Sequence, residues 1–272
     1  MTVPRAPSVS PDDESAPAAP PGGQLPRLSP AAAPSAPLLP ASGGPRQRWR
    51  LYLRMPARQL PGELPAGTGA WASLLERGWL PLAGGPGRGR VVPAAQLPLG
   101  IAGEREIVDV ILAAHLPAAE VRERVRARLP PRVELVDLHD VWVGAPSASS
   151  ALVAADYRVE VTGATVFELR VAAEALLKAS TLPRERRREK TQAFDLRPLI
   201  ISLSVAAVPL PAGSGGDAPT AVVRTRLRHR PDAVGRPEDV LAALAGPPAL
   251  PLGGELRVLR IVRERLLTGE SA

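Results

Sequence analysis

The sequence predicts an α+β protein made of two tandem ferredoxin-like units, each in the order strand–helix–strand–strand–helix–strand, behind a disordered N-terminal tail. Three observations predict this arrangement. Hydrophobic periodicity gives that order across residues 46–144, and the same order returns across residues 156–268. Residues 1–45 are mostly Pro, Ala, Ser and Gly, with too few large apolar groups to offset the entropy cost of ordering.

In the first unit, apolar and polar residues alternate in short runs, a pattern typical of strands. The alternation is clearest at Trp49, Leu51 and Leu53, which share one face. Strands are predicted over residues 48–54, 91–97, 106–112 and 133–143, with the alternation of the last slipping near Val136, and helices over residues 69–77 and 117–129. The glycine-rich segment Gly84–Gly89 is predicted to be a loop or a hairpin tip.

The second unit has the clearer pattern. Pro237 followed by two acids predicts the start of a helix, because proline tolerates the first helical position and acids favour the positive end of the helix dipole. Strands are predicted over residues 157–161, 199–208, 221–229 and 256–267, helices over residues 165–179 and from residue 236, a loop over residues 209–219, and a boundary between the units over residues 144–155.

Composition excludes several kinds of chemistry. The 272 residues include no cysteine, which excludes disulfides, cysteine-ligated zinc, iron–sulfur clusters and a cysteine nucleophile. There is no run of about 18 apolar residues and no apolar segment of the signal-peptide kind near the N-terminus, so we expect a cytoplasmic protein without a membrane span. His115, His139 and His229 lie far apart, and we expect neither a metal nor another cofactor.

Six stretches in a fixed order resemble one protein family. They are Leu-Pro-Leu-Ala at 80–83, Leu-Pro-Leu-Gly-Ile-Ala-Gly-Glu at 97–104, Ala-Pro-Ser at 145–147, Ala-Ala-Asp-Tyr-Arg-Val at 154–159, Asp-Leu-Arg-Pro-Leu at 195–199, and Arg-Pro-Glu-Asp-Val-Leu at 236–241. In this order and spacing they resemble the radical SAM-linked protein domain, a family of unknown function. The resemblance covers roughly residues 46–268.

The resemblance implies a non-catalytic partner, because members are fused behind a radical SAM enzyme or encoded separately from it. This chain departs from the family in two places. The family's Ser-His-Leu-Asp stretch has no counterpart in residues 56–70, and its Gly-Phe-Asn-Pro-Arg-Pro-Arg stretch is reduced to Gly-Pro-Gly-Arg-Gly-Arg at residues 85–90. Because a radical SAM cluster needs three cysteines, this chain is not the catalytic partner.

Basic residues predict binding to a nucleic acid, and the formal net charge is +7. If the strands over residues 199–208 and 221–229 form a hairpin, the basic side chains gather on one side and can follow a phosphate backbone. The residues concerned are Arg184, Arg186, Arg187, Arg188, Lys190, Arg224, Arg226 and Arg228. A solvated basic surface without a ligand is the alternative. Only Phe194 lies nearby, so base stacking is not expected at this patch.

Two further groups are candidates for binding or catalysis. Asp195 and Arg197 are predicted to share a strand face, where they either orient a ligand phosphate or carboxylate or form a structural ion pair. Glu104, Glu106 and Asp109 are the densest acidic group near a glycine-rich turn; a solvated strand edge is favoured over acid–base work for them.

The sequence therefore favours a non-catalytic accessory protein that partners a radical SAM enzyme and presents RNA to it. A stand-alone RNA-binding or ribosome-associated protein is the alternative. A carboxylate-based hydrolase is the third hypothesis, and it is disfavoured because no Gly-x-Ser-x-Gly or metal-ligand spacing is present.

Overall fold

The computed structural model describes residues 46–77, 79–84, 89–187, 191–208, 221–230, 233–247, 249 and 253–269. The predicted disordered tail over residues 1–45, the tip of the glycine-rich segment and the predicted loop over residues 209–219 lie outside the described residues. All the described residues belong to one compact unit. They form strands and helices around one main sheet, so the predicted α+β class is confirmed.

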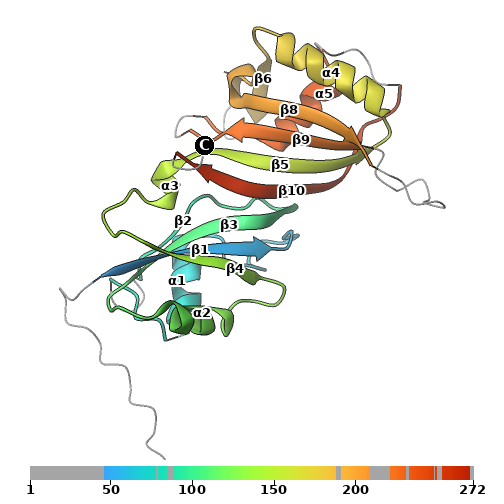
Figure 1. Cartoon of the computed structure of the whole chain (residues 1–272). Helices are drawn as coiled ribbons and strands as arrows, with labels where there is room; N and C mark the ends of the chain where they lie inside the picture. The colour runs from blue at the N-terminus through green and yellow to red at the C-terminus, as the bar shows by residue number, and fades with distance from the viewer. Residues whose placement is uncertain are drawn as a thin grey trace, which may run out of the picture. The chain divides into compact units, whose positions relative to one another are not determined.

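Seven strands of the main sheet lie side by side in the order β4-β1-β3-β10-β5-β9-β8, and the short β2 pairs with β3 (Figure 1). The strands are β1 (Gln47–Met55), β2 (Val91–Pro93), β3 (Ile101–Leu112), β4 (Glu134–Val141), β5 (Leu152–Thr162), β8 (Ile200–Ala207), β9 (Ala221–Arg228) and β10 (Arg257–Thr268). The β6 (Pro183–Arg187) and β7 (Thr191–Asp195) strands form a separate hairpin.

Two sets of four strands repeat one pairing scheme. The first set has the spatial order β4-β1-β3-β2 and the second has β10-β5-β9-β8, with antiparallel pairing throughout each set. β10 also pairs in parallel with the start of β3, so both sets belong to one sheet. The division into ferredoxin-like units over residues 46–144 and 156–268 stays a prediction.

The first core forms because alternate residues of β1 face two helices. Trp49, Leu51 and Leu53 are buried and cluster with residues of α1 (Thr68–Glu76) and α2 (Ala118–Arg126). On α2, Val121 and Val125 are buried, and their spacing of four residues places them on one face of the helix. The intervening residues of β1 therefore point to the opposite face of the sheet.

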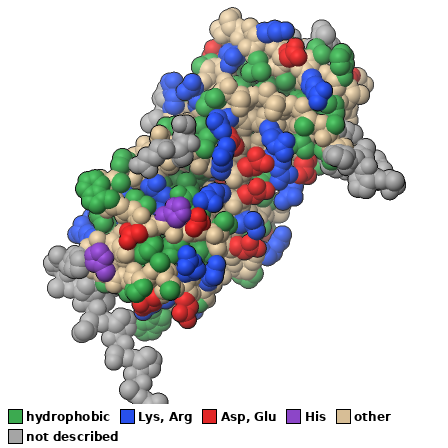
Figure 2. Space-filling view, in the orientation of Figure 1, with side chains coloured by type: hydrophobic (Ala, Val, Ile, Leu, Met, Phe, Trp, Pro, Cys, Tyr) green, Lys and Arg blue, Asp and Glu red, His purple; other side chains and the backbone are tan. Residues whose placement is uncertain are grey.

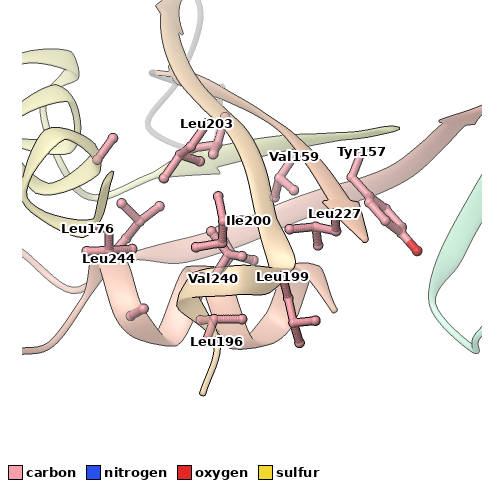
Figure 3. Close-up of a cluster of buried hydrophobic side chains, with 14 of the residues drawn as sticks. Tyr157, Val159, Leu176, Leu196, Leu199, Ile200, Leu203, Leu227, Val240 and Leu244 are labelled. Carbon is pink, nitrogen blue, oxygen red and sulfur yellow. The ribbon is translucent and has the colours of Figure 1, made fainter. Parts of the chain in front are cut away.

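The second core lies between the sheet and the helices α4 (Val166–Lys178) and α5 (Pro237–Leu244). Figure 3 shows Tyr157 and Val159 of β5, Leu227 of β9 and side chains of both helices in one cluster. The α4 helix begins with a capping box, in which Thr165 accepts from the Glu168 N–H and Glu168 accepts from the Thr165 N–H. A one-turn helix, α3 (Ala148–Ala151), lies in the segment predicted as the boundary.

The predicted slip near Val136 is confirmed. Tyr52 pairs with Asp137 but Leu53 pairs with Leu135, which leaves Val136 outside the β1–β4 register. The shared strand for Asp195 and Arg197 is wrong. Asp195 ends β7, and Arg197 begins the 3-10 helix η1 (Arg197–Leu199). The β6–β7 hairpin was not predicted, because its charged residues lack a clear apolar alternation.

Candidate nucleic-acid interface

The second strand set has one polar face. On β9, Val223, Thr225 and Leu227 are buried toward α4 and α5, so Arg224, Arg226 and Arg228 point the other way. Opposite residues on β5 share this face, since Asp156 pairs with Arg226 and Arg158 with Arg224. We call this surface the arginine face: it comprises Asp156, Arg158, Glu160, Arg224, Arg226 and Arg228. In Figure 2, basic and acidic side chains lie interleaved on one face of the molecule.

Asp156 is held between two arginines of the neighbouring strands. Arg226 donates to it through Nε at 2.7 Å and Nη2 at 3.1 Å, and Arg265 of β10 donates through Nε at 2.6 Å. Burial by itself raises the pKa of Asp156, but hydrogen bonds and charge from Arg226 and Arg265 outweigh it and lower the pKa. Asp156 is therefore ionised at neutral pH, and its single carboxylate forms ion pairs with both Arg226 and Arg265.

Arg158 is the centre of a second network on this face. Its guanidinium donates to Glu104 at 2.9 Å and to Glu264 at 3.0 Å, and it also pairs with Glu160. Burial lowers the pKa of Arg158, but its bonds to the glutamates outweigh this and raise it. Arg158 is thus fully occupied by acids and is not available to a ligand.

Arg224 and Arg228 are the exposed arginines of β9. Arg228 donates through Nε to the Pro198 carbonyl at 3.1 Å, which fixes its direction while the guanidinium stays in solvent. Arg224 and Arg228 are therefore the exposed cations of the arginine face, whereas Arg158 and Arg226 form ion pairs within it.

The structure places the other predicted basic residues elsewhere. Arg186 packs over the Phe194 ring at 4.2 Å and donates to Asp239 of α5 at 3.1 Å and to the Val234 carbonyl at 2.7 Å. Arg184 donates to the carbonyls of Pro183 and Pro247. Arg188, Lys190 and the side chain of Arg187 lie outside the described residues.

The two groups of predicted basic residues are not brought together. Arg186 bonds to α5, which covers the buried side of the sheet, whereas Arg224 and Arg228 lie on the opposite side. The side chain of Arg186 is only 15% exposed, so its expected position on a solvated surface is wrong. That these residues bind a nucleic acid stays a prediction.

Asp195 and Arg197 each bond to the backbone. Asp195 accepts from the N–H groups of Leu182 at 2.7 Å and Arg197 at 2.9 Å. The Arg197 guanidinium donates to the carbonyl of Leu177 in the last turn of α4 and to that of Ile200. The Asp195 side chain thus links the two ends of the β6–β7 hairpin. The Arg197 side chain caps the last turn of α4, where helix carbonyls lack partners within the helix.

The acidic group of β3 is divided among three arginines. Glu104 bonds to Arg158, Glu106 to Arg263 and Asp109 to Arg50. Glu106 and Asp109 are 3% and 1% exposed, so the expectation of a solvated edge is wrong for them. These three pairings could not be found from strand alternation, because each arginine comes from a different strand.

The described part of the chain contains no group of three or more His, Cys, Asp or Glu side chains placed to hold a metal ion. A cavity of about 10 Å³ beside Arg58, Trp71 and Glu106 has room for about one water molecule. Among the described helices, none combines the length and the apolar character needed to cross a membrane.

Comparison with known sequences identifies a family. A sequence profile described as "Uncharacterized protein conserved in bacteria (DUF2344)" matches residues 87–232, more than half of the chain. The match runs from the glycine-rich segment through the arginines of β9. No curated protein matches the chain.

Proposed function

Since this chain belongs to DUF2344, a family of uncharacterized proteins conserved in bacteria, we propose that it is a non-catalytic accessory protein that binds RNA on the arginine face. The observation that carries the proposal is the exposure of Arg224 and Arg228 on one face of β9, turned away from the buried core. The internal ion pairs of the face hold its other charges in place, so these two arginines are the ones that meet a ligand.

The chemistry of arginine suits a phosphate backbone. A guanidinium can donate two parallel hydrogen bonds to one phosphate, and each neutralised phosphate releases counterions. Four residues along a strand span roughly 13 Å, so Arg224 and Arg228 reach separate phosphates of one extended strand. Binding through two such contacts is weak and depends steeply on salt.

The enzyme that acts on the RNA is proposed to be a radical SAM enzyme. Support for this partner comes from the six stretches described above and from the absence of cysteine in the 272 residues, which leaves the cluster to another chain. A radical SAM gene beside the gene for this protein, followed by co-purification of the two tagged products, tests the pairing. Failure of the two purified proteins to associate would remove this partner but not the RNA contact.

The RNA contact is tested by fluorescence anisotropy of a labelled single-stranded RNA at several salt concentrations. We expect Arg224→Gln/Arg228→Gln to weaken binding for all sequences alike and to flatten the slope of log K against log salt by about 1.4, which is roughly 0.7 for each lost contact. The matched control is Arg126→Gln/Arg128→Gln, which removes two exposed arginines at the end of α2. Equal curves for the two double variants would refute the arginine face as the binding surface.

A further inference from the structure

A cluster of planar polar side chains lies on the first strand set, on the face turned away from α1 and α2. It comprises Tyr52 of β1, Arg105 of β3, and Asp137 and His139 of β4, and we call it the Tyr52 cluster. Tyr52 lies between the buried Leu51 and Leu53, which face the helices, so its ring points to the opposite side.

The planar groups of the cluster are fixed by one another. The Arg105 guanidinium lies 4.2 Å above the centre of the Tyr52 ring, and the His139 ring meets the Tyr52 ring edge-on at 5.0 Å and 61°. Asp137 Oδ2 bonds to Arg105 Nη2 at 3.2 Å and lies 2.9 Å from His139 Nε2. Asp137 Oδ1 in turn accepts from the Leu138 N–H at 2.9 Å, so the carboxylate that orients both groups is itself held.

These fixed groups are also accessible. The side chains of Arg105 and His139 are 40% and 51% exposed, and that of Asp137 is 37% exposed. A guanidinium and an imidazole that keep their planes while open to solvent are arranged for stacking against a flat ligand, because little side-chain entropy remains to be lost.

The charge of the cluster favours a base over a phosphate. Arg105 is compensated by Asp137, and the nearby Arg54 is compensated by Glu134 at 2.7 Å. A phosphate would meet a carboxylate here as well as a cation. An unstacked base instead offers a ring to Arg105 and His139, and its exocyclic amino group can donate to Asp137.

The cluster also adjoins the arginine face. Glu104, the neighbour of Arg105 in β3, bonds to Arg158 at 2.9 Å, which places the two surfaces on either side of one ion pair. One extended RNA strand therefore reaches both. We propose that the Tyr52 cluster stacks a nucleobase of the RNA whose backbone lies on the arginine face; this inference rests on the proposed function.

The test uses the full chain and two labelled oligomers of equal length, one a mixed-sequence single-stranded RNA and one with abasic sites throughout. We expect Arg105→Lys/His139→Ala to weaken binding of the RNA about tenfold, because base stacking is worth roughly 1–3 kcal/mol per base. Binding of the abasic oligomer and the salt slope should stay as in the natural protein. Arg105→Lys keeps the charge and removes the plane, so a purely electrostatic contact would not respond.

The control is His115→Ala, which removes an exposed histidine outside the cluster. Thermal midpoints of the double variant and of the control are measured first, so that a folding defect is not mistaken for lost binding. Equal affinity of the natural protein for RNA and abasic oligomer, with no loss in the double variant, would overturn the stacking inference and leave the arginine face intact. A natural protein that binds neither oligomer would overturn both.

Discussion

Arg263 of β10 and Glu106 of β3 form a buried ion pair between the two strand sets. Arg263 Nε lies 2.8 Å from Glu106 Oε1, and the two residues are 2% and 3% exposed. Arg263 also donates to the carbonyls of Ala95 and Gln96, after β2. Gly103, which pairs with Arg263, leaves the space that Glu106 occupies, since a Cβ there would lie 2.5 Å from Glu106 Cγ.

Glu106→Gln should destabilise the protein by about 3–5 kcal/mol, because it leaves the guanidinium of Arg263 buried without its counter-charge. Replacing both partners, as in Glu106→Gln/Arg263→Met, should cost less than the single change. Urea unfolding monitored by circular dichroism measures both. The matched control is Glu104→Gln, whose side chain is 43% exposed and whose loss should be small. A single variant as stable as the control would contradict the pair's role.

Arg186→Ala should destabilise the protein by about 1–3 kcal/mol, because it removes a bond to Asp239 and a contact over the Phe194 ring. Arg184→Ala is the comparison, since Arg184 bonds only to exposed carbonyls among its described contacts and its removal should be near neutral. Thermal unfolding of the two variants distinguishes them. Equal midpoints would mean that Arg186 acts as a solvated charge.

Asp156 should make stability depend on acid pH. Its folded-state pKa is lowered by Arg226 and Arg265 against the opposing effect of burial, so its contribution is present above the unfolded value near 3.8 and is lost as pH falls through the folded pKa. Asp156→Asn should therefore lower stability at pH 7, and the difference between variant and natural protein should disappear as the pH falls from 7 through the folded-state pKa of Asp156. Unfolding by urea across this range measures the convergence. A constant difference at every pH would exclude a titrating carboxylate as the cause.

Local patterns of the sequence determined much of the fold. Alternation in runs such as Trp49–Leu53 and Tyr157–Val161 predicted strands that the structure contains, and its interruption at Val136 predicted a real shift of register. These features follow from side chains a few residues apart, since a strand turns successive residues to opposite faces. The absence of cysteine is also read directly from the sequence, and it excludes disulfides and cysteine-ligated metal sites whatever the fold.

Only the tertiary structure decided which side chains contact one another. Tyr52 and His139 lie on neighbouring strands although 87 positions separate them in the chain, and Arg263 finds Glu106 across 157 positions. Strand alternation says which face a side chain takes but not which strand lies beside it. Because β10 pairs with β3, Arg263 is buried beside Glu106. Because the β6–β7 hairpin packs on α5, Arg186 bonds to Asp239, whereas Arg224 and Arg228 remain in solvent.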